Sequence, residues 1–285
     1  MARNRTLGAS PSSAAEKRFK PAEPITSSDN RWLKRFRRAL RQAEAAEDGL
    51  VGIEGARLVE DALYSGIEVG ALLVSPSGEE HLGRLRTLLP PDAPLLRTTD
   101  RLFAAVADTQ TPQGIAALVR PRVTQFDDLV RGLALVVVLA GVQDPGNVGT
   151  ILRSAEAFGA SGVIAAKGTA HPFSPKALRA SAGSALRLPL FCGLALPVAL
   201  AQLRMAGLRL YAASLRGTLA PARADLRAPS ALIIGNEGAG LPADIERSVD
   251  ALLQIPIDAP VESLNAAVAA SVLLYEAARQ RTPQD

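Results

Sequence analysis

The second half of the chain contains four short aliphatic segments in which apolar and polar residues do not alternate, and this feature constrains the fold more than any other. The segments begin at Leu133, Gly162, Leu208 and Ala231, and stretches with helical periodicity separate them. A β-branched run without alternation is typical of a strand that is buried on both faces, as in a parallel sheet. We therefore expect an α/β fold in which helices cover a parallel sheet.

Composition narrows the class of protein further. The chain has 285 residues, of which 48% are hydrophobic, so it can bury the cores of one or two domains. Cys192 is the single cysteine, and the two histidines, His81 and His171, lie far apart in the sequence. This pattern argues against an internal disulfide and against a metal site. The sequence has neither a run of about 18 apolar residues nor a signal peptide, so we expect a cytoplasmic protein with no membrane partner.

Charge is distributed unevenly along the chain. Residues 1–42 contain 11 Lys and Arg against 3 Asp and Glu, a net charge of +8, whereas the remaining residues hold 21 basic and 25 acidic side chains, a net charge of −4. Residues 1–28 contain few large apolar side chains, which predicts a disordered basic arm. Such an arm either attracts a polyanion in a salt-dependent manner or remains a solvated tail. Charge alone leaves both possibilities open.

The chain divides into two predicted units. A small α/β unit is expected over residues 29–120, a linker over 121–132, and a second unit over 133–285 that ends in a helix at residues 263–280. Within the first unit, apolar spacing predicts two helices and short apolar runs predict three strands. The helices are expected at residues 31–40 and 56–64, and the strands at 50–54, 69–74 and 115–119.

Two polar loops follow strands of the second unit, where ligands bind in open α/β sheets. The first loop, Asp144-Pro-Gly-Asn147, has turn chemistry and leads into a helix that we expect to begin near Asn147 or Val148, with Arg153 about two turns further on. A helix N-terminus beside an arginine can bind an anion, although for this loop alone an ordinary turn with a surface arginine is the better explanation. The second loop, Gly235-Asn-Glu-Gly-Ala-Gly240, allows close approach of a ligand to the main chain.

The glycine spacing in the second loop disfavours a dinucleotide-dependent oxidoreductase. It is G-x-x-G-x-G and not G-x-G-x-x-G, and no P-loop sequence occurs in the chain. A third polar segment, Ile255-Pro-Ile through Glu262-Ser-Leu-Asn265, precedes the last predicted helix. Its simplest interpretation is a helix start, with Ser263 as the N-cap and Asn265 in the first turn. Each segment is unspecific when it is considered alone.

Together, in this order and at this spacing, the three segments resemble the three motifs of the SpoU family of RNA ribose 2′-O-methyltransferases, part of the SPOUT superfamily. The resemblance covers residues 133–281, and residues 31–119 are similar to the family's substrate-binding, RNA-binding-like domain. The resemblance implies a deep trefoil knot in the C-terminal parallel sheet, S-adenosylmethionine as cofactor, and a homodimer. Knots are rare in proteins, and nothing in the periodicity of the sequence predicts one.

The resemblance also implies roles for individual residues. Gly235, Ile255 and Leu264 match the cofactor-binding positions of the family. Arg153 is expected to clamp the RNA phosphate and stabilise the developing alkoxide, because a guanidinium normally stays protonated and is a poor base. Ser263, Asn147 and Asn265 are expected to orient the nucleotide or the loops, and Glu237 to hold Arg153 or a neighbouring amide. The catalytic set is therefore Arg153, Asn147, Glu237, Ser263 and Asn265.

The implied activity is methylation of a ribose 2′-hydroxyl, with 23S ribosomal RNA favoured as substrate because of the RNA-binding-like first unit. A transfer RNA 2′-O-methyltransferase and a non-catalytic RNA-binding assembly factor on the same fold are the alternatives. A basic group between the first two motifs is either a contact for the RNA backbone or a solvated face. It comprises Lys167, Lys176, Arg179 and Arg187.

Overall fold

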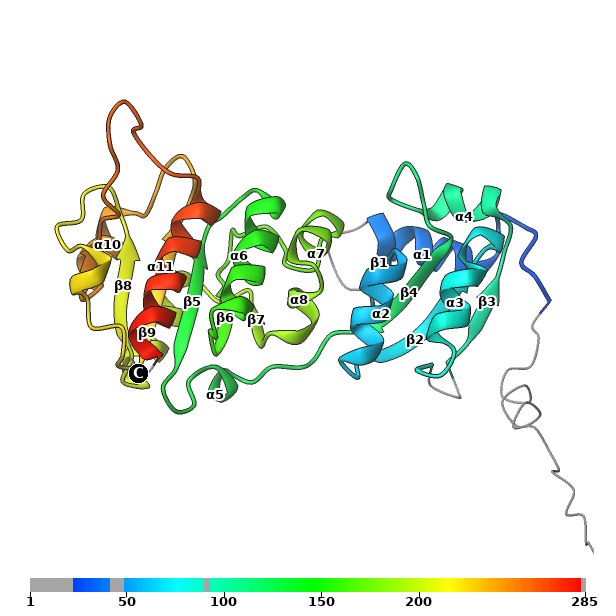
Figure 1. The fold of residues 1–285 in the computed structure, drawn as a ribbon, viewed down its shortest axis with the longest axis horizontal. Coiled ribbons are helices and arrows are strands. Elements are labelled where there is room, and N and C mark those ends of the chain that lie inside the picture. Colours follow the sequence, from blue (N-terminus) through cyan, green and yellow to red (C-terminus); the bar gives the residue numbers. More distant parts are fainter. Residues whose placement is uncertain (1–22, 42–48, 90–92, 283–285) are drawn as a thin grey trace, which may run out of the picture.

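The computed structural model describes residues 23–41, 49–89 and 93–282, and the structural statements below concern these ranges. Two units lie side by side along the long axis of the molecule, each built on its own sheet (Figure 1). The N-terminal unit has a four-stranded sheet, and the C-terminal unit has a six-stranded sheet. Within these ranges, none of the helices is long and apolar enough to cross a membrane.

The N-terminal sheet is mixed. Its strand order is β1-β4-β2-β3, with β4 antiparallel to both of its neighbours and β3 parallel to β2. Strand β3 was not predicted, because three residues are too few to show a period. The strands are β1 (Val51–Glu54), β2 (Glu68–Val74), β3 (Leu95–Arg97) and β4 (Ile115–Arg120).

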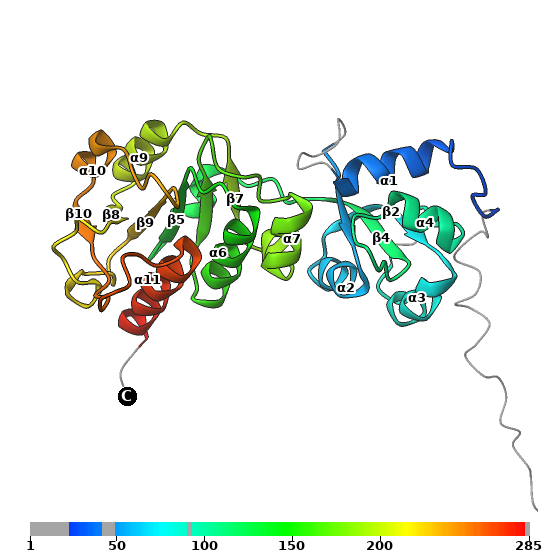
Figure 2. The ribbon, with the colours of Figure 1, turned by 90° about the horizontal axis from the view of Figure 1, so that it is seen from above.

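Helices cover both faces of this sheet (Figure 2). The predicted basic helix is α1, and its apolar side is buried at Leu33, Phe36 and Leu40 in a core shared with α4. Arg37 and Arg41 of α1 donate to the main-chain oxygen of Ala105 at 3.3 and 3.1 Å. The helices are α1 (Arg31–Arg41), α2 (Ala56–Tyr64), the 3-10 turn η1 (Pro76–Gly78), α3 (Glu79–Leu85) and α4 (Asp100–Val106).

The disorder predicted for residues 1–28 does not extend to Ile25. Ile25 forms a bridge with Thr98 and is only 9% exposed, because it packs against the core beneath α1. The Thr98 hydroxyl donates to the main-chain oxygen of Ile25 at 3.0 Å. The rest of the prediction for this arm, over residues 1–22, lies outside the described residues.

The C-terminal sheet is entirely parallel, as predicted, and its order is β10-β8-β9-β5-β6-β7. Every residue of β5 is buried, which explains why the sequence of this strand does not alternate. The three-residue strands β7 and β10 were not predicted, for the same reason as β3. The strands are β5 (Leu135–Ala140), β6 (Gly162–Ala165), β7 (Leu190–Cys192), β8 (Arg209–Ala213), β9 (Ser230–Gly235) and β10 (Ala251–Leu253).

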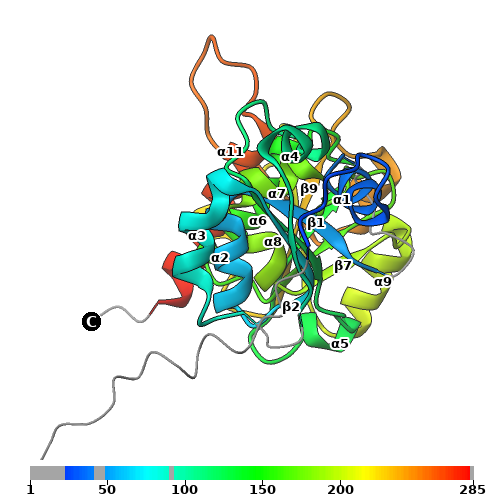
Figure 3. The same cartoon turned by 90° about the vertical axis from the view of Figure 1, so that its right-hand side faces the viewer.

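The loops that follow β5, β8, β9 and β10 reach one edge of the sheet, and the loop before the last helix projects beyond the body there (orange in Figures 1 and 3). The predicted linker contains a short helix, α5, whose Leu129 is buried. The helices of this unit are α5 (Phe126–Leu129), α6 (Pro145–Ala157), α7 (Pro175–Ser181), α8 (Ser184–Arg187), α9 (Leu196–Met205), η2 (Pro221–Arg223), α10 (Ala243–Ser248) and α11 (Ala266–Arg281).

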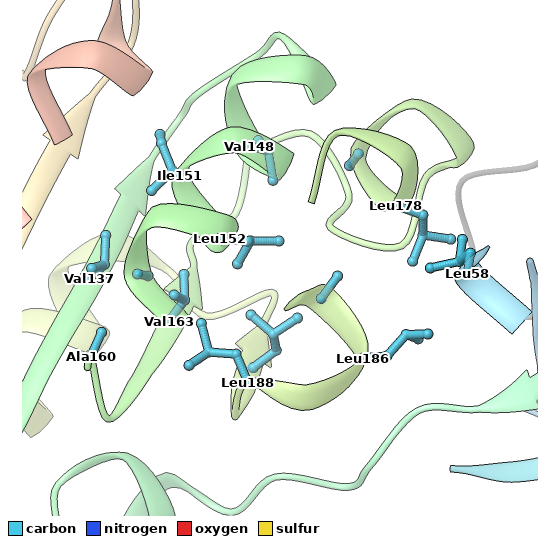
Figure 4. Packing of buried hydrophobic residues seen from close by; sticks show 14 of the residues in the cluster. Leu58, Val137, Val148, Ile151, Leu152, Ala160, Val163, Leu178, Leu186 and Leu188 are labelled. Carbon is cyan, nitrogen blue, oxygen red and sulfur yellow. The ribbon is translucent and has the colours of Figure 1, made fainter. Parts of the chain in front are cut away.

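The two units are in contact through α2 and α7. Leu58 of α2 lies beside Leu178 of α7, and both belong to the hydrophobic cluster that continues into the core around α6 (Figure 4). An ion pair adds to this contact, with 2.6 Å between Arg179 Nη1 and Asp108 Oδ2. The first unit is therefore packed directly against the helices that flank the predicted catalytic loops.

Candidate functional site

Asn236 joins the loop after β9 to the loop after β5. Its side-chain Nδ2 donates to the main-chain oxygen of Gly141 at 2.9 Å. Its Oδ1 accepts from the amides of Gly238 at 3.0 Å and Ala239 at 2.9 Å, which closes the glycine-rich turn. The sequence motif contains Asn236, but nothing in the sequence pointed to this structural role.

Glu237, from the same turn, binds the loop that begins α6. One carboxylate oxygen accepts from the amide of Gln143 at 3.1 Å, and the other accepts from the amide of Asp144 at 3.2 Å and from Asn147 Nδ2 at 3.0 Å. Burial acts to raise the pKa of Glu237, but these hydrogen bonds, led by the one from Asn147, hold it below its ordinary value. Of the two partners predicted for Glu237, the structure shows the neighbouring amides and not Arg153.

Asn265 extends this connection to the last helix. Its Nδ2 donates to Asn147 Oδ1 at 3.0 Å, while its Oδ1 accepts from the amides of Ala267 and Val268 at 2.9 and 3.3 Å. Glu237, Asn147 and Asn265 thus connect the three predicted motif segments, and we call them the three-loop network. Asn265 is the N-cap of α11, so the prediction of Ser263 as the N-cap is wrong. Helix α11 begins three residues later than the predicted start at residue 263.

The start of α6 is held by Asp144, the N-cap. Its Oδ1 accepts from the amides of Gly146 at 2.5 Å and Asn147 at 3.1 Å. Lys176 of α7 donates to the second carboxylate oxygen at 2.8 Å, and this bond is the main reason that the pKa of Asp144 is lowered. The helix begins at Pro145, two residues before the predicted start at Asn147.

Most of the predicted basic group is engaged within the protein. Lys176 pairs with Asp144, Arg179 pairs with Asp108, and Arg187 makes two 2.7 Å hydrogen bonds to Glu156. The fourth member, Lys167, is exposed, and no such pair is described for it. These ion pairs do not support an RNA-binding role for the group as a whole.

A cavity of about 460 Å³ lies beside the three-loop network. Its volume is within the range of about 300–1,000 Å³ that is typical of pockets for small molecules and cofactors. The three predicted cofactor residues, Gly235, Ile255 and Leu264, line it together with Ser263 and Glu237. Sequence reasoning missed the wall formed by the loop after β8 and by α10, although the first of these also follows a strand. That wall includes Ser214, Leu215, Arg216 and Glu246.

Gly235 is a glycine because its neighbours leave no room for a side chain. A Cβ at this position would lie 2.8 Å from the main-chain carbon and oxygen of Gly240 and 2.9 Å from Leu241 Cγ. The main chain at the end of β9 is therefore exposed to the cavity without a covering side chain, as a ligand held by backbone groups requires.

Arg153 does not join the other predicted catalytic residues. It is exposed on α6, and no side-chain hydrogen bond or ion pair links it to any residue that the structure describes. It follows Asn147 by six residues, which corresponds to about 9 Å along a helix axis. The structure thus groups Asn147, Glu237 and Asn265 in the network, places Ser263 at the cavity, and leaves Arg153 open to solvent.

Comparisons with known proteins agree with this architecture. Residues 134–275 match the model of the SpoU rRNA Methylase family, and residues 30–117 match an MRM3-like substrate binding domain. The 23S rRNA (guanosine(2553)-2′-O)-methyltransferase RlmP of Bacillus subtilis is 33% identical over 251 residues, which is 88% of this chain and 97% of the relative. The chain belongs to the SpoU rRNA methylase family.

Solved structures of SpoU-type methyltransferases have the same fold along nearly the whole chain. An AdoMet-bound rRNA methyltransferase from Sinorhizobium meliloti superposes with a TM-score of 0.80 at 30% identity, covering 92% of this chain and 99% of the other. The SpoU methyltransferase AviRb from Streptomyces viridochromogenes gives a TM-score of 0.79 at 28% identity, covering 88% of this chain and 98% of the other.

These findings confirm the predicted resemblance, the α/β fold with a parallel sheet, and the class of enzyme, an RNA methyltransferase that depends on S-adenosylmethionine. The deep trefoil knot is an implication of SpoU membership. The cavity fits the cofactor in its volume, in the bare main chain at Gly235 and in the apolar walls from Ile255 and Leu264. Among the described residues, no group of three or more His, Cys, Asp and Glu side chains is placed to hold a metal ion.

Proposed function

We propose that this SpoU protein transfers a methyl group from S-adenosylmethionine to a ribose 2′-hydroxyl of 23S ribosomal RNA. The observation that carries the proposal is the convergence of the cavity and the three-loop network at one edge of the parallel sheet. The RNA class is taken from relatives whose names give it. They include RlmP and the 23S rRNA (guanosine-2′-O-)-methyltransferase RlmB of Xanthomonas campestris, 38% identical over 154 residues, which is 54% of this chain and 62% of that relative.

Gly235, Ile255 and Leu264 hold the cofactor in this proposal. All three line the cavity, and Gly235 offers main-chain groups at close range. When bound, S-adenosylmethionine supplies an electrophilic methyl group on a sulfonium. The protein must then align a ribose hydroxyl with that methyl group and assist removal of its proton.

The three-loop network positions the reacting groups. Glu237 already accepts hydrogen bonds from two main-chain amides and from Asn147, so its carboxylate is committed to holding the loop after β5. Asn147 and Asn265 then fix the start of α6 relative to the start of α11. We assign these three residues to loop alignment, because a misplacement of about 1 Å at a reacting centre can slow a reaction about 100-fold.

Arg153 and Ser263 act on the RNA. Arg153 is exposed and has no described partner, so its guanidinium is available to clamp a phosphate in a bidentate manner and to stabilise the alkoxide as it develops. Ser263 is exposed and lines the cavity, where its hydroxyl can orient the target nucleotide.

A second copy of the chain completes the proposed assembly. Helix α11 exposes an apolar stripe at Val268, Val272 and Tyr275, which are 49%, 39% and 57% exposed. The same helix packs on α6, the helix of Arg153, through a 2.7 Å hydrogen bond between Ser154 and Ser271. A homodimer that covers this stripe would bring Arg153 close to the subunit interface.

Replacing Val272 with Glu is then expected to shift the mass measured by light scattering from dimer to monomer, and an unchanged dimer would contradict this interface.

The N-terminal unit supplies RNA binding in this proposal, with 29–120 as the substrate-binding domain, 121–132 as the linker and 133–285 as the catalytic domain. The match of residues 30–117 to a substrate binding domain supports this division. Because ribosomal RNA is the proposed substrate, the proposal also places the protein in the cytoplasm.

The deciding experiment uses labelled S-adenosylmethionine with separate samples of 23S ribosomal RNA and transfer RNA. We expect methyl transfer to 23S RNA. The phosphodiester bond on the 3′ side of the methylated ribose should then resist alkaline cleavage. Transfer to transfer RNA alone would support the alternative substrate. Binding of 23S RNA without any transfer would support a non-catalytic assembly factor.

A further inference from the structure

The cavity is also lined by a carboxylate outside the three motifs. Glu246 lies on α10, and its side chain is only 9% exposed. Its Oε1 accepts from the Ser214 hydroxyl at 2.8 Å, and its Oε2 lies 2.7 Å from Arg216 Nη2. All three residues line the cavity.

This carboxylate keeps acceptor capacity that the fold does not use. An ionised carboxylate has two oxygens with about four acceptor positions and no donor. The described contacts of Glu246 use one position on each oxygen. Two other polar side chains that line the cavity are already committed, Asn236 to two amides of its own turn and Glu237 to the loop after β5.

The arrangement favours a ligand group that is neutral and donates two hydrogen bonds. Arg216 balances the charge of Glu246, so an ammonium group placed there would also meet a guanidinium. A vicinal diol carries no charge and has two hydroxyl donors that match the two carboxylate oxygens. The same pairing of an acidic side chain with ribose hydroxyls occurs in dinucleotide-binding folds.

We infer that Glu246 binds the ribose hydroxyls of S-adenosylmethionine, with Arg216 as its counterion and Ser214 as the residue that positions it. This inference rests on the proposed cofactor site and adds to it a residue that binds the ribose hydroxyls. The Ser214 hydroxyl accepts from the amide of Arg216 at 3.1 Å while it donates to Glu246, so the loop after β8 presents both partners together.

The test compares the dissociation constants of nucleosides that differ in one group. S-adenosylhomocysteine and 5′-methylthioadenosine share the ribose, but only the first carries the amino-acid tail; the 2′-deoxy and 3′-deoxy forms of methylthioadenosine each lack one hydroxyl. Calorimetry on the wild type should show at least about tenfold weaker binding of a deoxy form, as expected for a lost hydrogen bond to a charged group.

The variant Glu246→Gln should weaken the binding of S-adenosylhomocysteine and of methylthioadenosine by a similar factor. It should also bind the deoxy forms almost as well as methylthioadenosine, because the carboxylate that distinguishes them is gone. Asp244→Asn is the matched control, because Asp244 is exposed on the same helix and does not line the cavity. Arg216→Ala provides a second variant, and equal melting temperatures would show that the variants fold.

The outcomes separate this inference from the proposed function. If Glu246→Gln weakens the binding of S-adenosylhomocysteine but not that of methylthioadenosine, Glu246 contacts the amino-acid tail and the inference is wrong. If the wild type binds the deoxy forms as tightly as methylthioadenosine, Glu246 does not bind the ribose hydroxyls and the inference is wrong. If the wild type binds neither S-adenosylhomocysteine nor methylthioadenosine, the proposed cofactor site itself is contradicted.

Discussion

The two units of this protein both bury aliphatic sheets under helices, yet they use polar side chains differently. In the N-terminal unit, Asp100 accepts hydrogen bonds from the hydroxyls of Ser75 and Ser77 at 2.5 and 2.7 Å, and this cluster secures a local turn and the start of a helix. In the C-terminal unit, Glu237, Asn147 and Asn265 connect three loops beside a cavity.

Sheet topology accounts for the arrangement in the C-terminal unit. All strands of the C-terminal sheet are parallel, so the loops after β5, β8, β9 and β10 meet at one edge. In the N-terminal sheet β1, β2 and β3 run in one direction and β4 runs in the other, so only β4 ends at the opposite edge. We propose that the C-terminal unit carries out the chemistry and that the N-terminal unit binds the RNA.

The largest effect is expected from Gly235→Val. The added side chain would collide with the main chain of Gly240 and with Leu241, and all three residues line the cavity. We expect the dissociation constant for S-adenosylmethionine to rise more than about 100-fold, consistent with a steric conflict of several kcal/mol. Gly83→Ala, on α3, is the control, because its Cβ would meet nothing within 4 Å and Gly83 does not line the cavity. An unchanged dissociation constant in Gly235→Val would exclude Gly235 from the cofactor site.

Arg153→Ala should abolish most methyl transfer and leave cofactor binding intact. Arg153 is exposed on α6 and does not line the cavity, so its loss removes transition-state stabilisation on the RNA side. We expect the single-turnover rate to fall by about 100-fold or more. Arg153→Lys should recover little of the methyl-transfer rate, because a lysine cannot bind a phosphate through two parallel N–H donors as a guanidinium does. A large loss of affinity for S-adenosylmethionine would contradict the RNA-side role.

Asn147→Asp tests the three-loop network. The substitution places a second carboxylate beside Glu237 and removes the donor that binds it at 3.0 Å. We expect methyl transfer and melting temperature to fall further than in Asn147→Ala, which removes this donor and also the acceptor for Asn265 but adds no charge. An aspartate variant as active and stable as the alanine variant would argue that the network does not align the loops.

Removal of residues 2–22 should have a smaller effect, confined to RNA affinity. This segment carries five Lys and Arg and one Glu, and its removal leaves the buried Ile25 in place. We expect the logarithm of the RNA association constant to depend less steeply on the logarithm of salt concentration. Identical slopes for the full and shortened chains would show that the arm is not part of the RNA-binding surface.

The smallest effect concerns pH. The pKa of Glu237 is lowered in the folded protein, so its ionised form stabilises the fold. That contribution is complete above the ordinary pKa of 4.5 and is lost as the pH falls through the lower folded value. Chemical unfolding of the wild type and Glu237→Gln should differ by no more than about 1 kcal/mol near neutral pH, and the difference should shrink below pH 4.5. A difference in unfolding free energy that grows as the pH falls would contradict a stabilising role for the ionised form of Glu237.

The sequence was sufficient to predict the long buried strands and the polar loops that follow them, because each of these is a local pattern. Strands β3, β7 and β10 have only three residues and show no period, so they were missed. Ser263 and Asn265 are both good N-cap residues, and the choice between them depends on where the projecting loop ends. Glu246 was missed because only the tertiary fold brings α10 to the loop after β8.

The proposed function depends most directly on which ligand binds in the cavity. A crystal structure of the protein grown with S-adenosylmethionine tests this claim. We predict the adenosine between the loops after β8, β9 and β10, against the main chain of Gly235 and within reach of Ile255 and Leu264. A cofactor bound at any other place, or a cavity filled by the protein's own side chains, would contradict the proposed function.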